Sequence, residues 1–269
     1  MKLILSIVLV YTCSFSHVFS QDTLITFFDS KWKETTEKNH VYYRKLFKNT
    51  LNTWVVQDFY KDGQKQMDGY FNNPKAEEKN GHFVYYHENG QKSSEGEYLQ
   101  GYKTGYWKGW FPSGAPDNEG GYLKGNRNGI WKWYHENGQL SARETYKNDK
   151  LKGFEFFDET GLQLPTKEDQ VSQKPEFPGG VDSLLNWLKI NLNYPGEARL
   201  KGISGIVYVN FKVNKDGSIA DLQIDNPVHP LLDNEAIRVV RNLPNWSPGK
   251  AHNRFIVVNY TIPIKFTLY

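Results

Sequence analysis

Cysteine is almost absent from this sequence: the 269 residues contain only Cys13, which lies in an apolar stretch near the N-terminus. We interpret Cys13 as one more apolar residue of that stretch, because the residues before it lack the small side chains of a lipoprotein cleavage site. A mature chain without the stretch would contain no cysteine, which excludes disulfides, a thiolate nucleophile and cysteine-based metal sites. Such a protein must be stabilised by packing alone.

An excess of charge is also lacking. The chain has 33 basic and 30 acidic residues, a formal net charge of +3, and no block of like charges. A nucleic-acid partner needs a run of cations to neutralise its phosphates, so we expect none. The sequence also shows no nucleophile motif, phosphate-binding loop or metal cluster, so we expect neither enzymatic activity nor a cofactor.

One long apolar stretch is present, at residues 3–15, and Ser16 and His17 interrupt it soon afterwards. A helix that spans a bilayer needs about 20 apolar residues, and this stretch is shorter. The layout is typical of a secretory signal peptide over residues 1–20, with cleavage predicted after Ser20. The alternative is an uncleaved inner-membrane anchor.

The middle of the chain repeats every 24 residues, which is the strongest internal pattern of the sequence. Glycine recurs at this interval, and three columns of aromatic residues recur with it. The glycines are Gly81, Gly105, Gly129 and Gly153, and the aromatic residues are Phe83, Trp107, Trp131 and, one position early, Phe154; Tyr86, Trp110, Tyr134 and Phe157; and Tyr98, Tyr122 and Tyr146.

Each unit has the pattern of one β-hairpin. A short aromatic strand runs into Asn89-Gly90 or Asn137-Gly138, dipeptides that tolerate the positive φ of a tight turn. A lone hairpin is marginal in water, so the units should stack edge to edge into one elongated antiparallel sheet and bury their aromatic rings against each other. The segments FVYYHENGQK and WKWYHENGQL resemble MORN repeats in their bacterial variant, over residues 54–164. That resemblance implies an interaction surface, and residues 21–53 are predicted to be a β-rich cap.

The tripeptide His-Glu-Asn occurs twice, at residues 87–89 and 135–137. Histidine and glutamate together can hold a metal or perform acid-base chemistry. The two copies lie 48 residues apart and each precedes an exposed turn, so they recur because the unit recurs. We interpret them as solvated turn residues and predict no metal site.

The C-terminal third begins after a polar linker at residues 165–176. Val181, Leu184, Leu185, Leu188 and Leu192 are spaced as one helical face, which predicts a helix over residues 181–192 and a brief helical turn at 196–200.

A strand at residues 206–213, a turn at Asp216-Gly217 and a strand at 219–224 follow. The chain ends with a helix at 232–241, in which Ala236, Val239 and Val240 face inward, and a long strand at 255–268.

This order of elements, with the motifs FPGG, YPGEARLKGISGIVYVNFKVNKDGSIADLQI, PLLDNEAIRVVRNLPNWSPGK and VVNYTIPIKF, resembles the C-terminal domain of the TonB family over residues 177–269. The predicted fold class is α+β and mostly β: an elongated antiparallel sheet of stacked hairpin repeats, then a small domain with two helices and three strands. The resemblance implies a periplasmic or envelope location in a Gram-negative bacterium.

In the TonB family the last strand of the sheet binds a short extended peptide, the TonB box of an outer-membrane transporter. Carried over to this chain, the resemblance implies a peptide-binding edge at Val257, Val258, Asn259, Tyr260, Thr261, Ile262, Pro263 and Ile264. It implies a secondary contact at Asn191, Leu192, Asn193 and Tyr194. Pro263 supports an edge position independently, because proline cannot donate to a ladder. Alternatively, Pro263 only blunts the edge against aggregation.

Two functions are compatible with these features of the sequence. The first is an envelope binding protein that captures transporter peptides by strand addition. The second is a structural adaptor in which the repeats form the main binding surface. Transducers of the family have a membrane anchor and a long proline-rich spacer, and this chain departs from both features, which puts energy transduction in doubt. Inner-membrane motor proteins would be partners only of an uncleaved chain, and the sequence indicates no oligomeric state.

Overall fold

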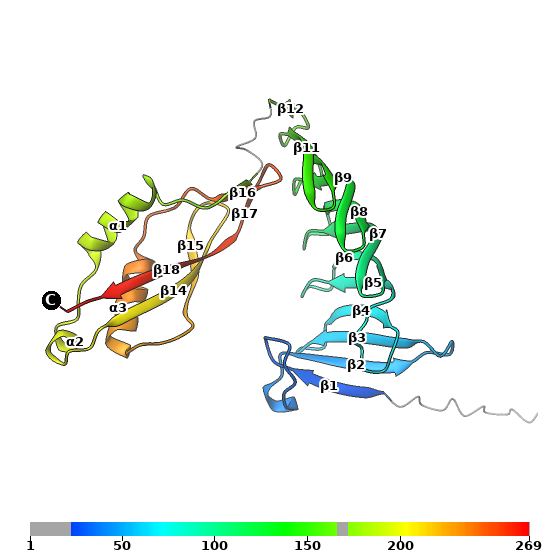
Figure 1. Cartoon of the computed structure of the whole chain (residues 1–269), viewed down its shortest axis with the longest axis horizontal. Coiled ribbons are helices and arrows are strands. Elements are labelled where there is room, and N and C mark those ends of the chain that lie inside the picture. The colour runs from blue at the N-terminus through cyan, green and yellow to red at the C-terminus, as the bar shows by residue number, and fades with distance from the viewer. Residues whose placement is uncertain (1–22, 166–171, 269) are drawn as a thin grey trace, which may run out of the picture.

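The computed structural model describes residues 23–165 and 172–268, which form two bodies. Figure 1 shows a long stacked sheet and a smaller domain with helices, which approach each other near strands β11, β16 and β17. The predicted signal peptide, with Cys13 and the cleavage site after Ser20, lies outside the described residues.

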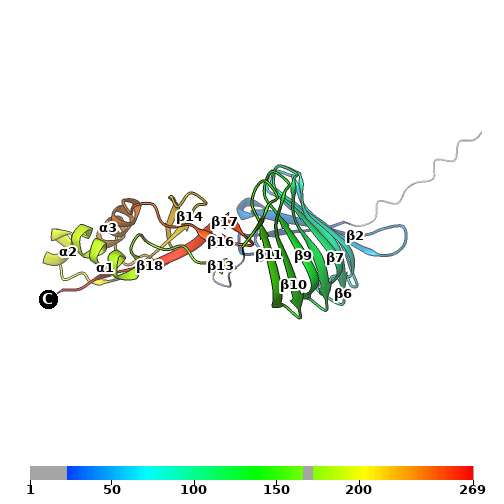
Figure 2. The ribbon, with the colours of Figure 1, turned by 90° about the horizontal axis from the view of Figure 1, so that it is seen from above.

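The first body, which we call the repeat sheet, is a twelve-stranded antiparallel sheet whose strands follow one another in chain order. Its strands are β1 (Leu24–Phe28), β2 (Tyr42–Lys48), β3 (Trp54–Tyr60), β4 (Lys65–Phe71), β5 (Gly81–Tyr86), β6 (Lys92–Leu99), β7 (Tyr102–Trp110), β8 (Pro116–Leu123), β9 (Asn126–Tyr134), β10 (Leu140–Lys147), β11 (Lys150–Phe157) and β12 (Gln163–Leu164). A short 3-10 helix, η1 (Glu37–Asn39), lies between β1 and β2. Seen from above, β6 to β11 lie side by side (Figure 2).

Two kinds of turn alternate along the repeat sheet. At the predicted turn, Gly90 has φ of 81° and the Asn89 side chain accepts the N–H of Gln91 at 3.1 Å. The opposite turn has only two central residues, Gln100 and Gly101, with φ of 52° and 79°. Two successive positive φ angles match the twist of adjoining strands and form the tightest hairpin connection. The sequence pattern identified the first kind of turn and missed the second.

The interior of the repeat sheet depends on aromatic rings that lie over glycine. Trp131 is 2% exposed, and Gly120 pairs with both Trp107 and Trp131 on its two neighbouring strands. A Cβ atom on Gly120 would lie 2.3 Å from the Trp131 ring, and one on Gly96 would lie 2.3 Å from Trp107. Glycine therefore leaves the space in which the next unit buries its indole.

A column of cations covers these rings at the same 24-residue interval. The ammonium group of Lys103 lies 4.0 Å from the centre of the Trp107 ring, and the Arg127 guanidinium lies 4.0 Å from that of Tyr146. Lys79 occupies the equivalent position over Tyr98 at 5.0 Å. Burial lowers the pKa of Lys103. Each cation interacts with the π faces that it shields from water.

The fourth unit departs from the predicted pattern. The sequence placed its buried aromatic at Phe154, but Phe156 is the fully buried residue and Phe154 is only partly covered. The register between β10 and β11 shifts at Thr145 and Tyr146, which moves the following side chains by one position. Phe154 and Phe156 are two positions apart and therefore share one face of β11, with ring centres 5.1 Å apart, and of the two only Phe156 is fully buried.

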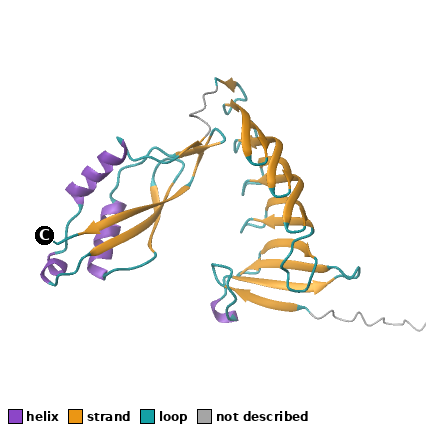
Figure 3. Cartoon of the chain, in the orientation of Figure 1, coloured by secondary structure: helices purple, strands orange, loops and turns teal. Residues whose placement is uncertain are grey.

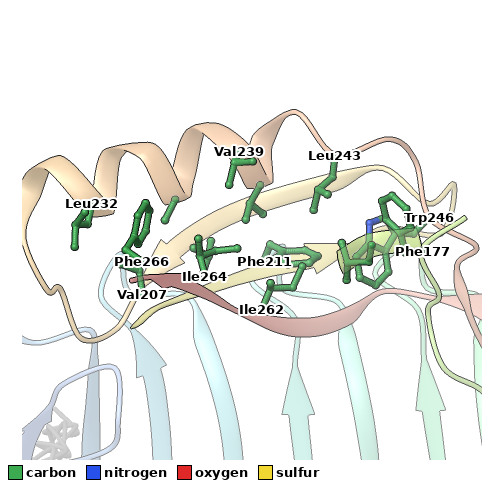
Figure 4. Close-up of a cluster of buried hydrophobic side chains, with 14 of the residues drawn as sticks. Phe177, Val207, Phe211, Leu232, Val239, Leu243, Trp246, Ile262, Ile264 and Phe266 are labelled. Carbon is green, nitrogen blue, oxygen red and sulfur yellow. The ribbon is translucent and has the colours of Figure 1, made fainter. Parts of the chain in front are cut away.

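The second body contains the other helices (Figure 3). Its elements are β13 (Ser172–Gln173), α1 (Gly180–Asn191), α2 (Gly196–Leu200), β14 (Gly205–Val213), β15 (Ile219–Ile224), α3 (Pro230–Arg241), β16 (Gly249–Ala251), β17 (Arg254–Ile256) and β18 (Val258–Phe266). They form two small sheets, ordered β15-β14-β18 and β13-β16-β17. A hydrophobic core fills the space between α3 and the first of these sheets (Figure 4).

Two details of this domain correct the sequence prediction. Val181 and Leu185 were assigned to the buried face of α1, but they are 66% and 59% exposed, whereas Leu184 is buried and Trp187 packs against the core. The predicted strand at 255–268 is two strands that break at Val257, and β16 and β17 form a separate hairpin.

We predict that Gly120→Ala lowers the free energy of unfolding by about 3 kcal/mol, because its methyl group would overlap the rigid Trp131 ring in a packed interior. The matched control is Gly153→Ala, since nothing lies within 4 Å of the added carbon and the backbone is not in the left-handed region. Urea denaturation of both variants measures the difference. Equal stabilities would show that the stacking over Gly120 does not stabilise the sheet.

Candidate functional site: the free edge of strand β18

Strand β18 forms one margin of its sheet. Among the strands of the described residues it pairs with β14 alone, in a register that runs without interruption from Val213 opposite Val258 to Gly205 opposite Phe266. The predicted edge residues from Val258 to Ile264 all lie in this strand, whereas Val257 lies at the break before it. We call the unpaired side of β18 the free edge.

Pro263 determines which backbone groups point to the free edge. It lies opposite Tyr208 and has no N–H to donate, so this pair is a non-hydrogen-bonded one in the antiparallel ladder. Bonded and non-bonded pairs alternate, and therefore Asn259 and Thr261 also direct their N–H and C=O groups outward. Tyr260 and Ile262 direct theirs to β14.

Side chains along β18 alternate between buried and exposed from one residue to the next. Ile262, Ile264 and Phe266 are at most 3% exposed and pack into the core under α3, whereas Asn259 and Thr261 are exposed. The inward side chains hold the strand on its domain. The outward backbone groups therefore belong to a strand whose inward side chains are packed in the core.

The opposite margin of the same sheet, β15, has an irregular edge. Between Asn210 and Lys212 of β14 the facing strand contains one extra residue, and Asp221 in that bulge has φ of 52°. The Asp221 carboxylate forms an ion pair with Lys212 at 2.7 Å. A bulge and a charge both obstruct pairing with another strand. Of the two margins, only β18 presents a regular ladder.

The predicted secondary segment, residues 191–194, lies at the C-terminal end of β18. The Tyr194 ring meets the Phe266 ring edge to face, with centres 5.6 Å apart. The Asn193 N–H donates to the Glu235 carboxylate at 2.6 Å, and the Arg238 guanidinium donates to the Asn191 carbonyl at 2.7 Å. These bonds from α3 fix the segment beside the strand.

Glu235 is a residue that the sequence analysis did not single out. Burial raises the pKa of the Glu235 carboxyl, but hydrogen bonds from Arg238 and from the Asn193 N–H outweigh burial and lower it. The group is therefore ionised at neutral pH and holds two partners at once. A glutamate three positions before an arginine in a helix was the available signal, although that pattern alone gives no hint of the contact with residue 193.

Two further residues that the sequence did not indicate, Asn210 and Asp225, lie beside the predicted edge residue Thr261 on the exposed face of the sheet. The Thr261 hydroxyl donates to the Asn210 side chain at 2.6 Å, and Asn210 donates to Asp225 at 2.7 Å. These residues line a shallow depression of about 320 Å³ that also includes Asn259. Asn210, Asp225 and Thr261 come from three segments of the chain, and only the folded sheet brings these residues together.

The repeated His-Glu-Asn segments are less solvated than the sequence suggested. The His87 Nε2 group donates to the Trp110 carbonyl at 2.8 Å, and His135 donates to Phe157 at 2.9 Å. Each histidine is half-buried and bonds the next unit along the sheet. Within residues 23–165 and 172–268, no three His, Cys, Asp or Glu side chains gather as a metal ligand set. None of the helices described is long and apolar enough to cross a bilayer.

Comparison with known proteins concerns the C-terminal domain. Residues 190–268 match the family model described as Gram-negative bacterial TonB protein C-terminal. Two NMR solution structures of the Helicobacter pylori TonB C-terminal domain are similar at 24% and 26% identity, with TM-scores of 0.25 and 0.26. They cover 32% and 34% of this chain, and the matches cover 90% and 87% of those structures.

No curated protein sequence matches the chain. The family match covers both the segment at residues 191–194 and the whole of β18. Residues 190–268 of this chain therefore form a domain of the TonB C-terminal family.

Proposed function

We propose that this chain is an envelope protein that captures an extended peptide of an outer-membrane transporter by strand addition along the free edge of β18. The observation that carries the proposal is the regular, unpaired ladder of β18, in a domain of the TonB C-terminal family. Membership of that family supports a TonB-like role in transport and a place in the envelope.

Strand addition suits this edge physically. An incoming peptide would bond to the backbone groups of Asn259 and Thr261, which provides affinity independent of sequence. Its side chains on the exposed face would meet the polar depression beside Asn210, which gives a means of selection. The segment at residues 191–194 lies at the far end of the same strand, where the peptide would leave the edge.

Cleavage after Ser20 stays a prediction of the sequence. A cleaved chain would be free in the periplasm and could not couple to an inner-membrane motor through its own helix. Sequencing of the mature N-terminus decides between the alternatives, because Gln21 as the first residue would exclude an N-terminal anchor.

We predict that Asn259→Pro weakens peptide binding at least about tenfold and leaves the fold intact, because the lost N–H points to the free edge. Tyr260→Pro should instead destabilise the domain by about 3 kcal/mol or more, because it removes a bond to β14. Isothermal titration with a transporter-derived extended peptide and thermal melting of both variants provide the two measurements.

The two variants distinguish an edge that binds a peptide from an edge that is only protected against pairing with another strand. If Asn259→Pro binds the peptide as tightly as the parent, capture along β18 is refuted. If Tyr260→Pro melts with the parent, the assignment of inward and outward backbone groups is wrong. The adjacent positions of the two substitutions make each the control for the other.

The repeat sheet offers an alternative binding surface. Tyr106 and Ile130 are 52% and 55% exposed and occupy equivalent positions in successive units, as do Leu99 and Leu123 at 58% and 52%. Recurring exposed apolar side chains are typical of an interaction surface. Co-purification of envelope partners with full-length Asn259→Pro and with full-length Tyr106→Asp, Ile130→Asp distinguishes the two functions. Loss only in the second variant would favour the adaptor.

A further inference from the structure

The hairpin of β16 and β17 touches the repeat sheet through its turn, His252 and Asn253, and through Arg254; we call it the docking hairpin. The His252 ring stacks on the Trp133 ring, with centres 3.5 Å apart and planes 7° from parallel. The His252 Nδ1 group donates to both oxygens of the Glu144 carboxylate, at 2.8 and 2.9 Å. The contact joins residues more than a hundred positions apart in the chain.

Glu144 is fully buried, and a carboxylate in such a position requires several donors. Besides His252, the Trp133 indole donates to it at 2.9 Å and the Tyr146 hydroxyl at 2.7 Å. Burial raises the pKa of the Glu144 carboxyl, but the bonds and charge of His252 with these other donors outweigh burial and lower it. The docking hairpin therefore supplies the partner that this buried charge needs.

Two further residues of the docking hairpin bond to the repeat sheet. The Asn253 amide donates to the Phe157 carbonyl at 2.8 Å, and Asn253 is 9% exposed. Arg254 donates to the Tyr134 carbonyl at 2.6 Å and forms an ion pair with Asp117. Its guanidinium also lies over the rings of Phe111 and Trp133. All three successive residues thus contact strands β8 to β11 or the turns beside them.

The surface of the repeat sheet that contacts His252 differs in sequence from the equivalent positions of the preceding units. The positions 24 and 48 residues before Glu144 are Gly120 and Gly96, the glycines over which tryptophan rings stack. The positions 24 and 48 residues before Trp133 are Gly109 and Tyr85, so an aromatic ring also occurs there in one earlier unit. The carboxylate that receives His252 replaces a residue with no side chain in both preceding units, and the ring replaces one in the unit directly before. We call Trp133, Glu144 and their neighbours Asp117, Tyr134 and Phe157 the socket.

The turn of the docking hairpin places both of its central side chains on the repeat sheet. His252 and Asn253 have φ of 52° and 59°, the conformation of a two-residue hairpin turn. Asparagine and histidine are among the non-glycine residues that adopt this conformation most often. Both side chains contact the socket, His252 by stacking and a hydrogen bond and Asn253 by a hydrogen bond.

We infer that the socket is a dedicated docking site for the β16–β17 hairpin of the same chain, so that the repeat sheet is a rigid arm that sets the direction of the free edge. Only Val257 separates β17 from β18, so whatever holds the docking hairpin also holds the start of the edge strand. The inference goes beyond peptide capture and does not depend on it, because its evidence and its test involve no peptide.

The test measures the distance between the two bodies in the full chain by pulsed electron paramagnetic resonance. Spin labels at Ser113→Cys and Lys189→Cys, both exposed, report on the repeat sheet and on α1 in a Cys13→Ser background. Domains joined by a linker move relative to each other unless their interface holds them. The parent should give one narrow distance distribution.

His252→Gly and Glu144→Gly should each broaden this distribution to at least about twice the parent width, since motion between domains is otherwise the default. Both variants are expected to fold: glycine suits the positive φ at position 252, and glycine already occupies the equivalents of position 144 in two other units. The double variant should be no broader than either single one, because both remove the same contact. Circular dichroism checks that the repeat sheet stays folded.

The matched control is Arg143→Ala, next to Glu144 on the other face of β10, where the side chain pairs with Glu155 in solvent. It should leave the distribution narrow. A broad distribution in the parent, or a narrow one in both glycine variants, overturns the inference. A dipolar signal between singly labelled chains would show that the hairpin docks in a second copy, which also overturns docking within one chain.

Discussion

Every strand of this protein must find partners for the backbone groups along its two margins, and this constraint explains the form of both bodies. In the repeat sheet each unit supplies the edge on which the next unit pairs, so β2 to β11 have a neighbour on both sides. In the C-terminal domain the same constraint is met by a bulge on β15 and is left open on β18. Of the two margins of the β15-β14-β18 sheet, the one along β18 therefore remains regular and unpaired.

Packing in the repeat sheet is governed by the size of one residue in each unit. A glycine beneath each of Phe83, Trp107 and Trp131 lets a single layer of sheet bury these large rings, and the Lys103 ammonium group lies over the Trp107 ring. This arrangement continues until Glu144 stands where the glycine should be. The exchange ends the regular stack and creates a buried charge, and that charge is satisfied by a histidine from the other domain. Glu144 thus marks both the end of the glycine column and the contact between the two bodies.

Much of the candidate site could be predicted from particular residues. Pro263 indicated a marginal strand because its nitrogen has no hydrogen, and the structure places β18 at the margin with Pro263 in it. The alternation of Asn259, Thr261 and Ile262 was also readable, because successive side chains of a strand face opposite ways. Glu235 and Asn210 could not be assigned, because their partners at positions 193 and 225 lie on other elements.

The sequence by itself determined the stacked hairpins and the order of elements in the C-terminal domain, because periodicity and turn residues act between near neighbours in the chain. The tertiary structure decided which side of α1 is buried, since Leu184 packs into the hydrophobic core of the domain while Val181 and Leu185 stay exposed. It also decided that the final strand breaks at Val257, because β17 pairs with β16 while β18 pairs with β14. The meeting of His252 with Glu144 has the same origin: it depends on the relative position of two folded bodies, and no local pattern encodes that position.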